Sequence, residues 1–369
     1  MRRSAAGVIA VSALLALGGA AAAAPRVEVP NVTLERVGTT DPVHRSLDYV
    51  SATHSLTLSY PGATYVKVHV ERLTLLPGDW LTIADAKGGQ AREYRFGLAG
   101  QWAMSVDGDT AVLTLHGRLA RLTGFGVTVD RVAHGYPETK RSHRPESVCG
   151  NDDSRDAVCY KSTDPVAYRN SRAVARLLIN GDELCSAWRV GPNNRMFTNH
   201  HCFTSTVDAR NTEVWFNYEC AVCGGFATLP PVKVTGDTVL ATDATLDFTL
   251  FSVQNFAAVR AFGYLSLDPR DPAAGEQLYI PEHPGGEPTI LAIASDQDRA
   301  GNCQVHDSAV DGYGHDTDIA YLCDTAGGSS GSPVLSRVSN RVVALHHFGG
   351  CPNQGVRMDL IYRRIASLL

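Results

Sequence analysis

One serine-rich stretch of the chain carries residue types that can do covalent chemistry. Residues 323–335 read CDTAGGSSGSPVL, with three serines among glycines. Gly/Ser-rich stretches are ordinarily turns or linkers, so further residues must show whether one serine is reactive. A serine hydroxyl is a weak nucleophile unless a base removes its proton. Histidine is a suitable base near neutral pH, and a carboxylate must orient it.

Two other stretches supply such a histidine and such an acid. The segment MFTNHHCF contains His200 and His201 directly after a predicted strand. The segment TLDFTLF places Asp247 at the head of an apolar run, where a carboxylate can be partly buried. The order His201, Asp247, Ser330 predicts a hydrolase with a serine nucleophile. We expect three neighbours to have supporting roles only: His200, Ser329 and Ser332.

A second interpretation of the same serines can be excluded. Residues 327–331 match GxSxG, the pattern of the nucleophile turn in α/β-hydrolases. That fold requires the order serine, acid, histidine, within a parallel sheet that alternates with helices. After Ser329 the only acid is Asp359, and no histidine follows it. The chain therefore does not fit an α/β-hydrolase.

The elements that must position these residues are predicted to be β-strands. Residues 50–135 contain about seven runs of alternating apolar and polar residues, such as SLTLSY, which favours a β-sandwich. Residues 149–369 contain many short strands, such as ELCSAWRVG and RVVALHHFG, typical of an all-β barrel or sandwich core. The last segment predicts an amphipathic helix with apolar residues at helical spacing: Met358, Ile361, Tyr362, Ile365 and Leu369.

The beginning of the chain predicts export. Residues 1–24 have two arginines, an apolar run and a stretch of alanines before Pro25, the layout of a secretory signal peptide. The apolar run is too short to span a bilayer, so we expect a secreted protein without a membrane anchor. The formal charge of −5 and the absence of a long basic run argue against nucleic acid as a partner. We expect protein or peptide substrates and a monomer.

The nine cysteines divide the chain into two parts. All lie between Cys149 and Cys351, and in an oxidising compartment they are most simply disulfides with one left over. The boundary predicts a sandwich over 25–135, a linker over 136–148 and a second domain over 149–369. A lone CxxC, Cys220 to Cys223, and an Asp/His-rich loop at 306–318 match no metal template, so no metal and no cofactor are expected.

Together the three motifs resemble those of the chymotrypsin-fold, or trypsin-like, serine endopeptidases. In this chain, TNHHC at 198–202 resembles the histidine motif of that family, DFTL at 247–250 its aspartate motif, and GSSGSP at 328–333 its nucleophile motif. With PEHPGG at 281–286, the resemblance is to the secreted bacterial branch of lysyl and glutamyl endopeptidases. It covers residues 149–369 and implies a double β-barrel with a C-terminal helix. The preceding sandwich looks faintly like CUB-type extracellular domains.

The resemblance also implies roles for individual residues. Ser330 is the expected nucleophile, and the backbone N–H groups of Gly328 and Ser330 are the expected donors to the oxyanion. Four disulfides are implied: Cys185–Cys202, Cys149–Cys351, Cys303–Cys323, and Cys159 with either Cys220 or Cys223.

Specificity has two interpretations. Asp324, six residues before Ser330, is expected at the floor of the primary pocket, where it would favour a substrate Lys or Arg at P1. Thr325 and His346 occupy positions that resemble those holding a substrate carboxylate in glutamyl endopeptidases. Asp324 could instead only cap a turn.

Three further alternatives stay open. The sandwich is either a propeptide removed near Lys140 and Arg141 or a permanent domain. Ser329 stands where trypsin-like zymogens carry the aspartate that pairs with a new N-terminus, so that switch is expected to be missing. Outside proteolysis, the chain could be a binding protein on a peptidase fold or an adhesion protein acting through its sandwich.

Overall fold

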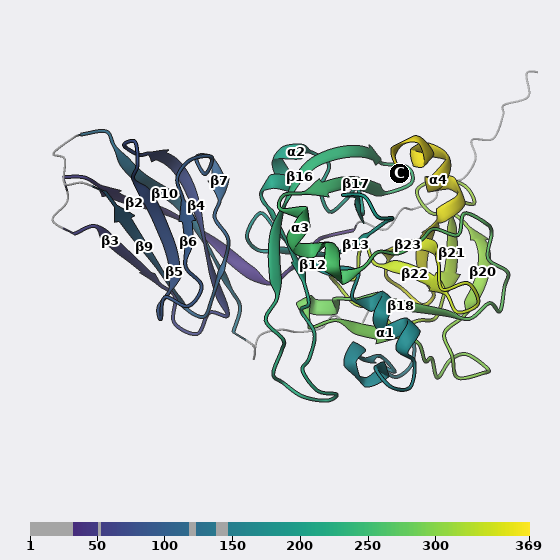
Figure 1. Cartoon of the computed structure of the whole chain (residues 1–369). Coiled ribbons are helices and arrows are strands. Elements are labelled where there is room, and N and C mark those ends of the chain that lie inside the picture. The colour runs from purple at the N-terminus through teal and green to yellow at the C-terminus, as the bar shows by residue number, and fades with distance from the viewer. Residues whose placement is uncertain (1–31, 51–52, 118–122, 138–146) are drawn as a thin grey trace, which may run out of the picture.

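The computed structural model describes residues 32–50, 53–117, 123–137 and 147–369. The expected signal peptide and the expected processing site at Lys140 and Arg141 lie outside these residues. Figure 1 shows two β-rich modules, a smaller one at the left and a larger one at the right. Among the described residues, no helix has both the length and the apolar character needed to cross a bilayer.

The smaller module is a β-sandwich, as the alternating pattern predicts. One sheet has the strands β2 (Gly38–Asp48), β10 (Gly126–Gly135), β4 (Tyr65–Thr74), β7 (Gln101–Trp102) and β8 (Val106–Asp107). The other has β3 (Ser55–Ser59), β9 (Thr110–His116), β5 (Trp80–Asp85) and β6 (Arg92–Tyr94). Alternate residues of β9 are buried, so the two sheets enclose a core between them.

The larger module begins with a closed six-stranded antiparallel barrel. Its strands, in spatial order, are β13 (Glu183–Arg189), β12 (Val174–Ile179), β15 (Thr212–Phe216), β16 (Val232–Asp243), β17 (Phe248–Val253) and β14 (Met196–Thr198). Pairing of β14 with β13 closes the barrel. A two-residue strand from the beginning of the described chain, β1 (Glu35–Arg36), adds to the edge of β13.

The second sheet of this module is a half-barrel. Its order is β11 (Arg155–Asp156), β19 (Ile290–Ala292), β18 (Leu278–Glu282), β22 (Pro333–Ser336), β23 (Val342–Phe348), β24 (Asn353–Arg357), β21 (Asp318–Tyr321) and β20 (Val305–Val310). The helices are α1 (Pro165–Ser171), α2 (Thr206–Arg210), α3 (Phe256–Val259) and α4 (Met358–Ile365). The predicted all-β class is thus confirmed: a sandwich followed by a chymotrypsin-like double barrel with a C-terminal helix.

Helix α4 differs in detail from the expected apolar face. Met358, Ile361 and Ile365 are fully buried, whereas Tyr362 and Leu369 are 38% and 39% exposed. Ile361 and Ile365 are four residues apart and share one face, which packs on the barrel core. Tyr362 follows Ile361 directly, so helical geometry turns it away from that face.

A buried ion pair joins the two modules. Lys67 on β4 bonds Glu213 on β15, and both side chains are essentially fully buried. The same carboxylate accepts hydrogen bonds from Ser105 N at 2.6 Å and Trp215 Nε1 at 2.7 Å. Burial alone raises the pKa of Glu213, but the charges of Lys67 and Lys233 and the hydrogen bonds from Lys67 and Ser105 N outweigh it and lower that pKa to about 2.

We predict that this ion pair stabilises the joined modules in a pH-dependent way. Because the pKa of Glu213 lies below its ordinary value of 4.5, its contribution is fully present above pH 4.5 and is lost as pH falls towards 2. Glu213→Gln leaves Lys67 buried without its counter-charge and lowers the free energy of unfolding by about 3–5 kcal/mol at pH 7. Thermal unfolding measures this, and the loss shrinks on acidification.

The matched control is Glu71→Gln, the same substitution at an exposed position of β4. It leaves the unfolding temperature of the chain within about 1 °C, since surface substitutions of this kind change stability by less than ~0.5 kcal/mol. Equal unfolding temperatures for the two variants at pH 7 would show that the Lys67–Glu213 pair does not stabilise the assembly.

Candidate active site

His201 and Asp247 are brought together at the end of the first barrel. His201 follows β14, and Asp247 precedes β17, the strand that pairs with β14. The Asp247 carboxylate accepts His201 Nδ1 at 2.7 Å and the His201 backbone N at 2.9 Å. Asn199 Nδ2 donates to the Asp247 carbonyl at 2.9 Å and so fixes this turn. The carboxylate is buried, yet the His201 charge and its hydrogen bonds hold the pKa of Asp247 well below its usual range.

The other nitrogen of His201 is placed to accept a proton. Because Nδ1–H donates to Asp247, a neutral ring carries its lone pair on Nε2. Nε2 is buried and has no hydrogen-bond partner among the described residues. His200 is turned elsewhere, with its Nδ1 2.8 Å from Thr242 Oγ1.

Ser330 lies on the same framework. Its carbonyl accepts Ser186 N from β13 at 2.8 Å. Ser186 is next to Cys185, which is bonded to Cys202, the residue after His201. Gly331 has a φ of 89° and packs so closely on Thr198 of β14 that a side chain there would overlap it. The expected nucleophile and the expected base are therefore held at one corner of β13 and β14.

The loop before Ser330 presents two backbone N–H groups. Gly327 O accepts Gly285 N at 2.6 Å, and in a planar trans peptide the N–H of Gly328 points the opposite way. Gly328 has a φ of 94° and packs against Leu184, so only glycine fits. No acceptor within the described ranges receives Gly328 N–H or Ser330 N–H. Both amides are thus available to an oxyanion.

A second histidine at the site was not foreseen from the sequence. His347 on β23 lies with its Nδ1 3.1 Å from Asp247 Oδ2 and its Nε2 2.5 Å from Asp318 Oδ2. Burial disfavours its charged form, but hydrogen bonds to both carboxylates outweigh burial and raise the pKa of His347 to about 9. Adjacent residues of a strand face opposite sides of the sheet. If His346 faces the expected pocket, His347 must therefore face the other side of β23, where Asp247 lies. That alternation was the signal available in the sequence.

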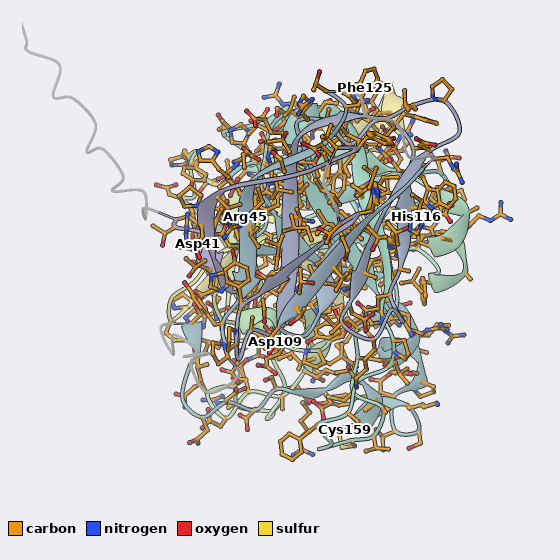
Figure 2. All side chains as sticks on the ribbon, turned by 90° about the vertical axis from the view of Figure 1, so that its left-hand side faces the viewer. Asp41, Arg45, Asp109, His116, Phe125 and Cys159 are labelled. Carbon is orange, nitrogen blue, oxygen red and sulfur yellow. A yellow bond between two sulfur atoms is a disulfide. The ribbon has the colours of Figure 1, made fainter. Side chains whose placement is uncertain are left out.

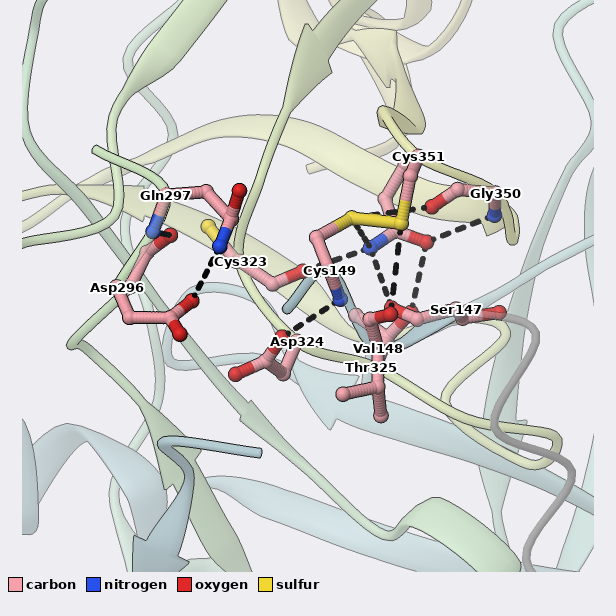
Figure 3. The surroundings of a disulfide bond; sticks show 12 residues. Ser147, Val148, Cys149, Asp296, Gln297, Cys323, Asp324, Thr325, Gly350 and Cys351 are labelled. Atoms are coloured by element: carbon pink, nitrogen blue, oxygen red, sulfur yellow. Dashed lines mark hydrogen bonds between the residues drawn. A yellow bond between two sulfur atoms is a disulfide. The ribbon is translucent and has the colours of Figure 1, made fainter. Parts of the chain in front are cut away.

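The expected specificity residues Asp324 and Thr325 form hydrogen bonds with other residues of the same chain. Asp324 accepts a hydrogen bond from Cys149 N at 3.0 Å (Figure 3) and another from Asp153 N at 2.8 Å, so its carboxylate caps the segment 149–153. Burial raises the pKa of Asp324 to about 6. Thr325 N donates to Ser147 O at 3.2 Å, in the residues just before that segment.

His346 is buried and faces a neighbouring tyrosine. Its Nδ1 lies 2.7 Å from the Tyr321 hydroxyl, which itself donates to Gln354 O at 3.0 Å. Burial and the charges of His347 and His201 lower the pKa of His346 to about 3. A neutral ring is a poorer partner for a substrate carboxylate than a charged one.

A cavity of about 1120 Å³ opens beside Asp324 and Thr325. Residues of both modules line it, including Tyr65 and Asp107 from the sandwich and Trp215 from the first barrel. Its lining contains the acids Asp107, Asp152, Asp156, Glu282, Glu287 and Asp324, with Arg176 as the cation among them. The cavity therefore favours a cationic group.

Four disulfides brace the larger module. They are Cys149–Cys351, Cys185–Cys202 and Cys303–Cys323, the pairs that the resemblance implies, and Cys159–Cys223, one of the two alternatives left open for Cys159. Figure 3 shows the first of them beside Asp324. Cys220 is the free cysteine and is buried, and burial raises the pKa of its thiol to about 11. A thiol in this state is a poor nucleophile and metal ligand.

Comparison with solved structures gives partial likenesses. The chain is similar to a Glu endopeptidase, with 17% identity and a TM-score of 0.42, over 60% of this chain and 100% of that one. It is also similar to the inactive form of the Rv3671c protease of M. tuberculosis H37Rv, with 14% identity and a TM-score of 0.41, over 60% of this chain and 98% of that one.

Comparison with curated sequences gives one relative and one family. Secreted RxLR effector protein 73 of Plasmopara viticola is 39% identical over 220 residues, which are 57% of this chain and 53% of that protein. The chain thus spans about half the length of this relative. Residues 185–345, which carry His201, Asp247 and Ser330, match the family described as the trypsin-like peptidase domain.

Proposed function

We propose that this protein is a secreted serine endopeptidase that works through His201, Asp247 and Ser330. The observation that carries the proposal is the buried His201–Asp247 pair, whose proton-accepting nitrogen has no partner among the described residues. The two amides of the adjacent Ser330 loop support it, as does the family match over 185–345.

Each residue has a distinct role in the proposed hydrolysis of a peptide bond. Ser330 Oγ attacks the scissile carbonyl carbon while His201 Nε2 takes the hydroxyl proton. The N–H groups of Gly328 and Ser330 stabilise the oxyanion of the tetrahedral intermediate. The C–N bond then breaks, His201 returns the proton to the leaving amine, and an acyl-enzyme remains on Ser330. Water, deprotonated by His201, hydrolyses the ester and restores the serine. Throughout, Asp247 holds the ring in its Nδ1–H tautomer and stabilises its charged form.

For specificity we propose a basic residue at P1. The charged residues that line the cavity next to Asp324 are acids apart from Arg176, which favours the ammonium or guanidinium group of Lys or Arg. The lowered pKa of His346 keeps that ring neutral at ordinary pH, which weakens the case for a substrate glutamate. Asp324 would act from its capped position at the cavity wall.

Export is part of the proposal. The expected signal peptide, the four disulfides and the name of the secreted relative all support an extracellular protein. Disulfides of this kind form in oxidising compartments, where each stabilises the fold by about 2–4 kcal/mol.

Digestion of a proteome-derived peptide library tests both function and specificity. We expect cleavage after Lys and Arg, abolished by Ser330→Ala. Asp324→Asn lowers kcat/KM for these substrates about 10- to 100-fold, because a charge-assisted contact is lost. Asp153→Asn, a neighbouring acid, is the matched control and changes it little. Cleavage after Glu that persists in Asp324→Asn would contradict the proposed preference for a basic residue at P1. Cleavage by neither the native chain nor a proteolytically activated one would favour a binding protein on a peptidase fold.

A further inference from the structure

The outer edge of β13 is shared by three partners. Trp188 and Arg189 pair with β14. Ser186 N donates to the carbonyl of Ser330 at 2.8 Å. At the start of the strand, Leu184 and Glu183 pair with β1. The expected nucleophile and β1 therefore lie on the same edge, and only Cys185 separates Ser186 from Leu184 along β13.

The residues that precede β1 extend along this edge towards Ser330. The pairing is antiparallel, with Glu35 opposite Leu184 and Arg36 opposite Glu183. The same register continued backwards sets Leu34 opposite Cys185. A strand rises about 3.3 Å per residue, so Glu35 is roughly 7 Å along the edge from the Ser186–Ser330 contact. Leu34 is half-buried and packs on the cluster that contains Cys185 and Cys202.

The two side chains of β1 contact the larger module, one of them at the loop that carries the expected oxyanion donors. The Glu35 side chain lies so close to Gly327 that a Cβ at position 327 would overlap it. Gly327 is bonded directly to Gly328, whose N–H is an expected oxyanion donor. Arg36 bonds Asp182 at 3.1 Å and Glu183 at 3.2 Å on the neighbouring turn and strand. Backbone pairing, a side chain against the loop and two ion pairs thus hold β1 in place.

Extended peptides bind proteins by adding a strand to an exposed sheet edge through main-chain hydrogen bonds. The edge of β13 beside Ser330 is such an edge, and β1 occupies it. We propose that β1 is a built-in inhibitory strand, which covers the part of the peptide-binding edge next to Ser330 and keeps the full chain latent. The inference rests on the proposed peptidase function and names the segment that regulates it.

The sandwich explains how so short a strand can stay bound. Two residues of pairing are weak alone, but β1 leads directly into β2 of the sandwich (Figure 1). The sandwich is fixed to the larger module by the ion pair of Lys67 and Glu213. Tyr65 OH also donates to Gly181 O at 2.8 Å. Tethering makes the pairing intramolecular and raises its effective concentration. Release of the sandwich would therefore release β1.

Charge reversal on β1 tests the inference in the full-length chain. Arg36→Asp places a carboxylate against Asp182 and Glu183 and repels the strand. We expect kcat/KM for a peptide substrate to rise at least tenfold, and amide hydrogen exchange at residues 183–185 to speed up. Arg45→Asp is the matched control: it makes the same charge change at an exposed position of the sandwich, at the end facing the viewer in Figure 2. The double variant Arg36→Asp/Glu183→Arg restores an ion pair and returns both readouts towards native values.

The outcomes separate this inference from the proposed function. Faster exchange at 183–185 without faster hydrolysis, in a chain that does cleave peptides, would show that β1 does not obstruct the site. Unchanged exchange and unchanged hydrolysis in Arg36→Asp would equally overturn the inference. Faster exchange in a chain that cleaves nothing, with or without Arg36→Asp, would instead refute the peptidase function.

Discussion

Replacement of His201 by alanine lowers kcat for peptide hydrolysis by about 10⁶-fold. The base and the nucleophile of a serine hydrolase act as one unit, so loss of either removes nearly all of the triad's contribution. Both His201 and His347 bond Asp247 through Nδ1, but Nε2 of His347 is held by Asp318, whereas Nε2 of His201 has no hydrogen-bond partner among the described residues. Steady-state kinetics with a substrate cleaved by the native chain measure the effect.

The neighbouring histidine supplies the control. His200→Ala removes an imidazole one residue away whose Nδ1 contacts Thr242 Oγ1. Its kcat stays within about threefold of the native value, since surface substitutions of this kind change energies by less than ~0.5 kcal/mol. A large loss of kcat in His200→Ala, with little loss in His201→Ala, would show that His200 and not His201 is the base.

Replacement of Asp247 by asparagine lowers kcat by about 10⁴-fold. Asparagine keeps the size and the acceptor oxygen, but its amide can donate to His201 and hold the ring in the wrong tautomer. It also removes the charge that stabilises the imidazolium during proton transfer. Because Asp247 is one of two acceptors of His347, the substitution also lowers the thermal stability of the chain.

A second substitution separates the catalytic effect from the structural one. Asp318→Asn takes away the other acceptor of His347 but touches neither His201 nor the Ser330 loop. It lowers stability, because a buried charge loses its partner, and it changes kcat far less than Asp247→Asn does. Equal kcat losses in the two variants would mean that Asp247 acts through packing of His347 and not through His201.

The sequence predicted those features that local pattern and chain order determine. Alternation of apolar and polar residues indicated strands such as β9, because one face of each strand meets the core. The residue types and order of His201, Asp247 and Ser330 indicated a nucleophilic serine. The roles of these three residues in catalysis remain a proposal that the experiments above test.

Features that depend on partners distant in the chain could not be predicted in this way. Lys67 and Glu213 are each unremarkable in sequence, and only folding of the two modules against each other makes them a buried pair. Asp324 was placed by its spacing from Ser330, but the amides of Cys149 and Asp153 that bind it come from the other end of the module. The strand β1 has two residues, too few to show any periodicity.

Covalent labelling of the nucleophile tests the central claim most directly. The native chain and the Arg36→Asp variant are treated with a fluorophosphonate, which reacts with activated serines, and then studied by intact-mass spectrometry and peptide mapping. The account predicts one adduct per chain, on Ser330, that is absent from Ser330→Ala and from His201→Ala. An adduct on Ser329 or Ser332, or no adduct on either chain, would contradict it.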